Sequence, residues 1–297
     1  MRVGTRGSAL ALAQARTVAR LLGSDVELVT VTTSGDRGSA AGRPVHDKER
    51  WVKELEVALL AGEIDLAIHS AKDVPSVLPE GLELVGAPAR GNPFDALVGA
   101  DALASLAGGA RVGTASLRRA AQLLALREDL AVSALRGNVD TRLRRLAEGE
   151  ADALVLAAAG LERLGRGEEI GCLLDELVPA PGQGTLVLEA RAGDAAAADA
   201  VRAITDAATW DALLAERACV AALDASCNTP LGVHARICAD GTIVMRTFAG
   251  LPDGSSWLRD ETPPCATPEA AGALAAERLL AAGGAELLAR AEAVAAP

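Results

Sequence analysis

The segment from Arg111 to Arg145 is the part of the chain best suited to bind an anion. It holds eight arginines and three acidic residues, a net charge of +5, whereas the whole chain carries −11. Arg118 and Arg119 open a helical pattern directly after a small, polar turn, and Arg136 stands just before a second turn. Unpaired N–H groups at a helix N-terminus attract anions, and arginine forks pair with carboxylates or phosphates. The segment therefore predicts a site for carboxylates or phosphates.

Four other arginines of this segment fit a solvent-exposed position better. Arg127 stands beside two acidic residues, a pattern typical of a surface ion pair of small energetic value. Arg111 precedes the turn, and Arg144 and Arg145 follow the second helix start. We predict that these four side chains face solvent.

A second candidate for chemistry is the turn 69–75, HSAKDVP, which follows a predicted strand. Its Lys72 and Asp73 place a cation and a carboxylate side by side. The chain has three lysines against 26 arginines, and all three lysines lie between residues 48 and 72. If arginine has replaced lysine wherever it could, the remaining lysines mark positions where the ammonium is needed. An isolated aspartate after a strand is most often a helix N-cap, so this pair alone does not establish a site.

The cysteines and histidines argue against metal and disulfide chemistry. Five cysteines form no CxxC pair, and three histidines are too few for a zinc site. Because the cysteine count is odd and the N-terminus lacks the apolar core of a signal peptide, we expect reduced thiols in the cytoplasm. Cys227 lies in a predicted turn, where a thiol is accessible, whereas Cys219 lies on a predicted helix as a small hydrophobic residue.

Composition excludes two classes of partner. The sequence pI is about 4.9, and the chain has no tyrosine and only two phenylalanines. Nucleic-acid binding needs a wide basic surface and aromatic rings for stacking, so we expect no nucleic-acid partner. No segment approaches the ~20 apolar residues of a membrane span, so we expect no membrane either. A small anionic molecule is the expected ligand.

Two short patterns occur twice in the same order. Arg-Val-Gly-Thr stands at 2–5 and at 111–114, each time before a small polar turn and a helix. Gly-Glu-x-Asp stands at 62–65 and at 149–152, each time between a helix and a strand. The repetition indicates two similar α/β lobes, and alternating strands and helices predict parallel sheets. Ligands of such sheets bind beyond the carboxyl ends of the strands, so the two lobes are expected to face a cleft.

The predicted elements divide the chain into three domains. In the first lobe we expect strands at 2–5, 26–33, 65–69 and 82–88, with helices from Ser8 to about Leu22 and at 51–62. Residues 178–184, VPAPGQG, break regular structure and predict a crossing or hinge. In the last region we expect helices at 210–223 and from Thr267 to about Gly283, with strands around 231–238 and 242–248. The expected fold is α/β with two lobes, 1–87 plus 184–203 and 92–180, and a smaller C-terminal α+β domain, 206–297.

A longer series of motifs runs from residue 2 to about residue 235. It comprises Thr5-Arg6-Gly7-Ser8 with Gln14, His69-Ser70-x-Lys72-Asp73-Val-Pro75, Gly113-Thr114-x-Ser116-Leu-Arg118-Arg119, Arg136-Gly137-Asn138 with Thr141-Arg142, Ala159-Gly160 with Arg163, Pro181-Gly-Gln183-Gly184, and Glu216-Arg217 with Cys227, Pro230 and Gly232. In this order the motifs resemble those of the porphobilinogen deaminase family, also called hydroxymethylbilane synthases. Each motif alone is weak, but the ordered set is highly specific.

The resemblance implies an enzyme of tetrapyrrole biosynthesis. The family joins four porphobilinogen units head to tail, releases ammonia from each, and hydrolyses off a linear hydroxymethylbilane. Its primer is a dipyrromethane held by a thioether, which the match places on Cys227. Three domains enclose the cleft, and the first two have periplasmic-binding-protein topology, in accord with the repeat. We expect a monomer whose partner is the small molecule porphobilinogen, with no bound metal.

The chemistry explains why these residue types are needed. Each porphobilinogen ring carries an acetate and a propionate, and each carboxylate brought into the cleft needs a charged partner. Asp73 is the acid among these cations, and we predict that it stabilises the cations formed as ammonia leaves and as rings couple, and that it moves the proton. The resemblance assigns dipyrromethane binding to Lys72, Thr114, Ser116, Arg118, Arg119, Arg136 and Arg142, and substrate binding to Arg6, Ser8, Gln14, Arg163 and Gln183.

The active-site loop departs from the family pattern. The family usually has Gly-Gly-Lys-Gly-Leu-Phe there, whereas residues 46–51 read His-Asp-Lys-Glu-Arg-Trp. Lys48 and Trp51 keep a lysine and an aromatic ring, but the flexible glycines are missing. A degenerate paralogue without turnover is therefore one alternative. The other is a two-lobed carboxylate-binding protein without catalysis, against which Cys227 and the Lys72–Asp73 pair argue.

Overall fold

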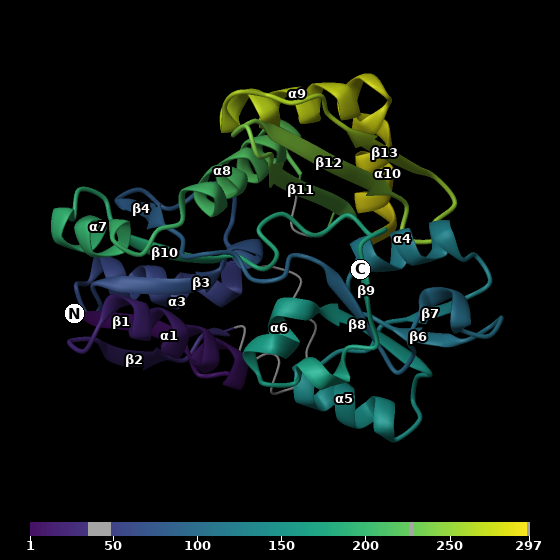
Figure 1. Ribbon diagram of the computed structural model, residues 1–297, viewed down its shortest axis with the longest axis horizontal. Coiled ribbons are helices and arrows are strands. Elements are labelled where there is room, and N and C mark those ends of the chain that lie inside the picture. The colour runs from purple at the N-terminus through teal and green to yellow at the C-terminus, as the bar shows by residue number, and fades with distance from the viewer. Residues whose placement is uncertain (35–48, 226–228, 296–297) are drawn as a thin grey trace.

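The structure is a computed structural model that describes residues 1–34, 49–225 and 229–295. These residues form two α/β lobes and a third region, which lie at the left, the lower right and the top of Figure 1. Each lobe is built on a five-stranded sheet, and the third region on a three-stranded antiparallel sheet. The predicted fold class is confirmed.

Lobe 1 is discontinuous in sequence. The chain leaves it after β4 and returns from lobe 2 to insert β10 between β3 and β4, giving the strand order β2-β1-β3-β10-β4. Ser8 caps α1 as predicted, because its hydroxyl oxygen accepts the Ala11 N–H at 3.2 Å. The elements are β1 (Arg2–Arg6), α1 (Ala9–Leu22), β2 (Glu27–Val31), α3 (Glu49–Leu60), β3 (Leu66–Ser70), the 3-10 turn η1 (Ala71–Asp73), β4 (Leu82–Gly86), β10 (Leu186–Arg191) and α7 (Ala195–Arg202).

Lobe 2 repeats this arrangement with the strand order β7-β6-β8-β5-β9. The two copies of Arg-Val-Gly-Thr fall on β1 and β6, and the two Gly-Glu-x-Asp patterns precede β3 and β8, so each pair occupies the same place in its sheet. The duplication is confirmed. The elements are β5 (Asp95–Val98), η2 (Leu103–Ser105), β6 (Arg111–Gly113), α4 (Leu117–Leu126), β7 (Ala131–Ser133), α5 (Val139–Ala147), β8 (Ala153–Ala157), α6 (Ala158–Arg163), η3 (Gly167–Glu169) and β9 (Cys172–Leu174).

The sheets are mixed, and the prediction of purely parallel sheets was wrong. In each lobe the strand that enters directly from a crossing, β5 or β10, runs antiparallel to both neighbours. The reason lies in where the crossing delivers the chain. Asp95 pairs with Ala157, the last residue of β8, and Leu186 pairs with Ser70, the last residue of β3. Both strands therefore start at the edge where the parallel strands end, which places Asp95 at the ligand-binding edge.

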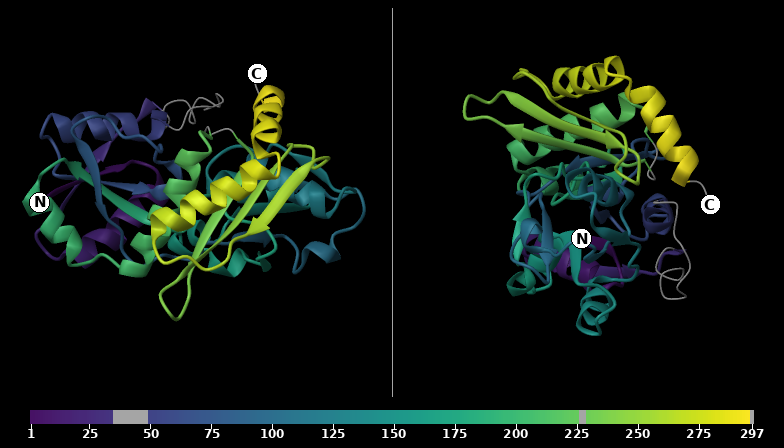
Figure 2. Two further views of the ribbon diagram at one scale, coloured as in Figure 1. Left: turned by 90° about the horizontal axis from the view of Figure 1, so that it is seen from above. Right: turned by 90° about the vertical axis from the view of Figure 1, so that its right-hand side faces the viewer.

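The third region packs its helices on its sheet and on one another. Its core consists largely of small residues such as Ala215, Cys219 and Ala275, which allow close helix packing. Thr267 caps α9 as predicted, accepting the Ala270 N–H at 3.2 Å. Figure 2 shows α9 and α10, in yellow, on the outside of this region, far from the N-terminus. The elements are α8 (Ala207–Ala222), β11 (Leu231–Ile237), β12 (Ile243–Gly250), β13 (Trp257–Glu261), α9 (Pro268–Ala281) and α10 (Gly284–Ala295).

Glu216 on α8 joins the third region to both crossings between the lobes. The first crossing connects β4 to β5, and the second connects β9 to β10. Its carboxylate, fully buried, accepts from Arg90 Nη1 of the first crossing at 2.8 Å and from the Gly182 N–H of the second at 2.6 Å. It also accepts the Ala235 N–H of β11 at 2.8 Å. Burial raises the pKa of Glu216, but Arg90 and His234 outweigh it and lower that pKa to about 2. The predicted crossing at 178–184 is thus fixed in place by one carboxylate.

Candidate functional site

The N-terminus of α4 presents Arg118 and Arg119 at the carboxyl edge of the lobe 2 sheet. Ser116 is the N-cap of this helix, and its hydroxyl oxygen accepts the Arg119 N–H at 3.4 Å. Thr114 is buried directly after β6, and its hydroxyl oxygen accepts the Ser116 N–H at 3.3 Å. Both hydroxyls thus shape the turn from which the two arginines emerge.

Asp95, which the sequence analysis did not single out, holds both arginines. Its buried carboxylate accepts from Arg118 Nη1 at 2.8 Å and Nη2 at 3.1 Å, and from Arg119 Nε at 2.8 Å. Burial raises the pKa of Asp95, but the two guanidiniums outweigh it and hold that pKa well below its usual range. Two buried cations thus share one buried anion, so the cluster keeps an excess positive charge.

Gln183 of the second crossing forms hydrogen bonds to both Asp95 and Arg119. Its side-chain nitrogen donates to Asp95 Oδ1 at 2.9 Å and to the Pro93 carbonyl at 2.8 Å. Its oxygen accepts from Arg119 Nη2 at 3.5 Å, and the side chain is buried. The amide of Gln183 is therefore committed to protein groups and connects the second crossing to Asp95 and Arg119.

Two guanidinium nitrogens at this edge are left without acceptors. Arg118 Nε and Arg142 Nε are buried and have no hydrogen-bond partner among the described residues. Burial, aided by the charge of Arg119, lowers the pKa of Arg142 to about 10. Buried donors are normally paired, so these two predict acceptors from outside the described residues, such as those of a ligand.

Lys72 and Asp73 approach this cluster from lobe 1. Burial lowers the pKa of half-buried Lys72, Asp73 and Asp95 oppose that shift, and Arg119 and Arg118 add to it, so that the resulting pKa is about 8. The lysine of one lobe therefore lies within the electrostatic field of the cluster on the other. The Asp73 carboxylate is half-buried and makes no hydrogen bond to any described residue, so it is available to a ligand.

The second crossing supports the Lys72–Asp73 turn directly. The Ala71 N–H donates to the Thr185 carbonyl at 3.0 Å. Gly182 has a φ of +73°, and a Cβ there would stand 2.8 Å from the Ala71 carbonyl carbon and the Lys72 nitrogen. Any larger residue would displace the turn.

The other predicted site residues are spread around this centre. Arg6 ends β1 and is half-buried, Ser8 caps α1, and Gln14 is buried within α1. Arg136 is exposed in the loop between β7 and α5. None of these four has a contact that identifies a ligand.

Each of the four arginines predicted to face solvent forms an ion pair. Arg111 and Arg144 are exposed as predicted, whereas Arg127 and Arg145 are half-buried. Their partners are Asp152 for Arg111, Asp129 for Arg127, Glu148 for Arg144 and Glu150 for Arg145.

Known families match almost the whole chain. A model described as "Porphobilinogen deaminase, dipyromethane cofactor binding domain" matches residues 1–199, and "Porphobilinogen deaminase, C-terminal domain" matches residues 210–281. The porphobilinogen deaminase of Deinococcus radiodurans is 47% identical over 86% of this chain and 87% of its own length. That of Thermus thermophilus is 44% identical over 97% of this chain and 98% of its own. This chain belongs to the porphobilinogen deaminase family.

Among solved structures, the methionine-binding protein MetQ matches with a TM-score of 0.44 and 19% identity, over 69% of this chain and 89% of that chain.

The cluster around Asp95 fits the cofactor named by the porphobilinogen deaminase model. A dipyrromethane carries carboxylates, and the cluster offers two unpaired guanidinium nitrogens and an excess of cations. Cys219 does not fit as its attachment point, because it is fully buried, and burial followed by the charge of Glu216 raises the pKa of its thiol to about 12. Within the described residues no cluster of His, Cys, Asp and Glu could hold a metal, and no helix is long and apolar enough to cross a membrane.

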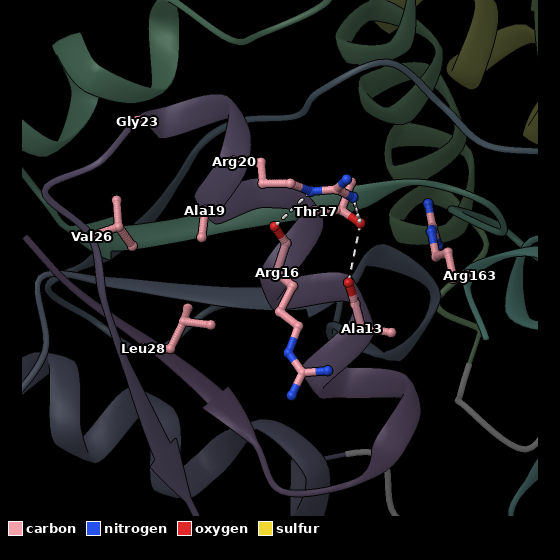
Figure 3. Close-up of a pocket in the computed structure, with 9 residues that line it drawn as sticks. All are labelled: Ala13, Arg16, Thr17, Ala19, Arg20, Gly23, Val26, Leu28 and Arg163. Atoms are coloured by element: carbon pink, nitrogen blue, oxygen red, sulfur yellow. Dashed lines mark hydrogen bonds between the residues drawn. The ribbon is translucent and has the colours of Figure 1, made fainter. Parts of the chain in front are cut away.

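Arg163, at the end of α6, is bound to the second crossing of this porphobilinogen deaminase family member. Its Nη2 donates to the Gly184 carbonyl at 2.6 Å. Figure 3 shows it lining a cavity of about 640 Å³ together with Arg16 and Arg20 of α1. In this view the three guanidinium groups point in different directions. The cavity therefore does not bring its cations onto a single anion.

Some predicted positions lie outside the described part of the chain. Lys48 and Cys227 fall in the segments 35–48 and 226–228, and the altered 46–51 loop begins in the first of them. Trp51 lies on α3, but its side chain is not described.

Proposed function

We propose that this chain catalyses the porphobilinogen deaminase reaction where Lys72 and Asp73 of lobe 1 meet Arg118 and Arg119 of lobe 2. The chain is an enzyme of tetrapyrrole biosynthesis: it condenses four porphobilinogen units onto a dipyrromethane, with loss of ammonia, and releases hydroxymethylbilane. The observation that supports this location is the electrostatic contact of Lys72 with the Asp95 cluster. Because Asp73 follows Lys72 directly, its carboxylate also lies near the excess positive charge of the Asp95 cluster.

In this proposal the cofactor is attached to Cys227 by a thioether. When bound, the dipyrromethane supplies the pyrrole carbon on which the chain grows. Arg118 and Arg142 would use their unpaired Nε donors to hold its carboxylates. Lys72, Arg119, Ser116, Thr114 and Arg136 complete the proposed cofactor-binding set.

Asp73 is the proposed catalytic residue. When ammonia leaves porphobilinogen, the C–N bond electrons depart with nitrogen and the substrate becomes a cation, which a nearby carboxylate stabilises. After the new C–C bond forms, the attacking ring must lose its α-proton, and Asp73 can accept it. A carboxylate already committed to a helix cap or an arginine could do neither as well.

The remaining assignments concern the incoming substrate. Arg6 ends β1, Ser8 caps α1 and Gln14 lies within α1. We assign these three residues to porphobilinogen together with Arg163. Gln183 belongs to the same set through its contact with Arg119. Lys48 and Trp51 are assigned to the active-site loop.

Intact mass tests the cofactor proposal. Freshly expressed protein should carry the mass of one dipyrromethane and should colour with Ehrlich's reagent. Cys227→Ser should show the bare polypeptide mass and no turnover, whereas Cys219→Ser should be loaded like the parent protein. Loading of Cys227→Ser, or a bare mass for the parent, would contradict the assignment.

The same preparations separate the alternatives. A two-lobed carboxylate-binding protein would bind porphobilinogen without covalent loading and without consuming it. A degenerate paralogue, suggested by the altered 46–51 loop, would be loaded but would not release product. Steady porphobilinogen consumption by the loaded protein excludes both.

Three broader assignments are also proposals. We place the domain boundaries at 1–87 plus 184–203, 92–180 and 206–297, because the strand orders separate at the two crossings. We propose a monomer, to be tested by sedimentation. We propose a cytoplasmic location on the basis of the odd cysteine count, to be tested by fractionation.

A further inference from the structure

Arg217 connects the third region to the turn that carries Asp73. From α8, its Nη2 donates to the Pro75 carbonyl at 2.8 Å and to the Ser76 carbonyl at 2.9 Å. Both carbonyls follow Asp73 closely in the chain. Since the donor is charged, these two bonds are stronger than ordinary backbone bonds and fix the path of the chain after Asp73.

A buried carboxylate stabilises this guanidinium. Burial lowers the pKa of Arg217, and the charge of Glu189 on β10 opposes that shift. Glu189 is fully buried; its Oε2 lies 2.9 Å from His69 Nε2, and its Oε1 has no hydrogen-bond partner among the described residues. The guanidinium is thus held between the turn and the sheet of lobe 1.

The same face of α8 also packs against the other side of the turn. Leu213, one helical turn before Arg217, is buried in a cluster with Ala71 and Val74. These two residues flank Lys72 and Asp73. One face of α8 therefore holds the backbone on both sides of the catalytic turn, by packing at Leu213 and by hydrogen bonds at Arg217.

α8 also leads toward the proposed cofactor attachment. It ends at Ala222, shortly before the segment that contains Cys227, and Glu216 fixes it to both crossings. Arg217 therefore acts on the Asp73 turn from a helix that is anchored to both crossings.

We propose that Arg217 is a positioning residue that fixes the turn carrying Asp73 relative to α8 and the two crossings that α8 anchors. This inference rests on the proposed role of Asp73. Arg217 donates to backbone carbonyls and is not assigned to any carboxylate of cofactor or substrate. Its loss should therefore misplace the catalytic carboxylate while leaving the arginines that bind carboxylates unchanged.

The test compares three variants of the loaded enzyme, with dipyrromethane content verified by intact mass. Arg217→Ala should lower kcat about 10- to 100-fold with little change in KM, because a small misplacement of a catalytic group has effects of this size. Arg217→Lys can reach one carbonyl and should give an intermediate kcat. Arg191→Ala is the matched control: Arg191 Nη1 donates to the Leu59 and Ile64 carbonyls at 2.9 and 2.8 Å in the same lobe, away from Asp73.

The outcomes decide between positioning and simple stabilisation. A kcat loss in Arg217→Ala that Arg191→Ala does not share, with partial recovery in Arg217→Lys, supports the proposal. Parental kcat in Arg217→Ala, or an equal loss in Arg191→Ala, overturns it. If Arg217→Ala does not fold, Arg217→Lys decides: a reduced kcat at unchanged Tm supports positioning, and an unchanged kcat refutes it.

A parallel Asp73→Asn variant keeps the two proposals apart. If Asp73→Asn is inactive and Arg217→Ala is normal, only the positioning role fails. If Asp73→Asn is active, the catalytic role of Asp73 fails, whatever Arg217→Ala shows.

Discussion

The carboxylate of Asp95 and the guanidinium of Arg118 form a buried two-point ion pair at the ligand-binding edge of lobe 2. Arg118 also donates to the Val178 carbonyl at 2.6 Å, so the second crossing is attached to the same side chain. This pair orients Arg118 with its Nε unpaired. The arginine that we propose to bind the cofactor is therefore already held in place by protein contacts.

Asp95→Asn should both destabilise the protein and prevent cofactor loading. The change leaves Arg118 and Arg119 buried without their counter-charge, and breaking a buried pair in this way costs about 3–5 kcal/mol of the free energy of unfolding. Urea denaturation measures the loss of stability, and intact mass measures the loading.

Asp152→Asn is the control for this prediction. Asp152 pairs with Arg111 on the surface, where both side chains are about half exposed, so the expected loss is below about 1 kcal/mol with normal loading. Equal stabilities of the two variants would contradict the structural role of Asp95.

Lys72 should make ligand binding depend on pH in the cofactor-free protein. Its pKa is lowered to about 8, and carboxylates brought beside it favour the charged form and raise that pKa. Binding of porphobilinogen to Cys227→Ser protein should therefore weaken as the pH rises through about 8, and should take up protons in that range.

Calorimetry in buffers of different ionisation enthalpy detects this proton uptake. Adding Lys72→Arg to the Cys227→Ser protein is the control, because a guanidinium stays protonated over the whole range. Proton uptake that is equal with Lys72 and with arginine at this position would exclude Lys72 as its source.

Asp73→Asn should abolish most of the turnover with little effect on stability. The carboxylate makes no hydrogen bond to any described residue, so its replacement breaks no hydrogen bond of that part of the chain and removes only the charge that acts on Lys72. Loss of a group that moves a proton and stabilises a cation should lower kcat about 100- to 10,000-fold. Asp73→Ala should load cofactor poorly or fail to turn over.

Porphobilinogen consumption and thermal unfolding, measured on the same preparation, check this prediction. Asp101→Asn, at an exposed position in lobe 2, should behave like the parent protein in both. Near-parental kcat in Asp73→Asn would remove Asp73 from the mechanism.

The sequence was most informative where structure is local. The caps at Ser8 and Thr267 and the repeated Arg-Val-Gly-Thr pattern predicted helix starts and the duplication correctly, because each depends on neighbours in the chain. α10 begins at Gly284, directly after Gly283, and was not predicted, since the two glycines after α9 carry no sign that a second helix begins there.

Long-range relationships could not be predicted from the sequence. Asp95 is one acid at the start of an apolar strand, and it becomes important only because β5 enters its sheet antiparallel and starts at the edge where β8 ends. Gln183 matched a family motif, but nothing local shows that its amide is buried between Asp95 and Arg119. A single acidic residue in an apolar segment, placed just after a crossing, is the signal that could have identified Asp95.

Glu216→Gln should loosen the junction between the third region and both crossings. The carboxylate accepts from Arg90 and from two backbone N–H groups, and an amide presents an NH₂ group to donors on one side. The unpaired guanidinium should cost about 3–5 kcal/mol of the free energy of unfolding at neutral pH.

This loss should shrink in acid. The pKa of Glu216 is about 2 in the folded protein and 4.5 when unperturbed. A lowered folded pKa means that the carboxylate stabilises the fold fully above about pH 4.5, and that this contribution disappears as the pH falls toward about 2. Urea denaturation of the parent and Glu216→Gln proteins, at neutral pH and at about pH 3, measures the change.

Glu148→Gln, in an exposed pair with Arg144, should cost less than about 0.5 kcal/mol at either pH. A difference between parent and Glu216→Gln that stays constant with pH would show that Glu216 is not the charged group at the junction.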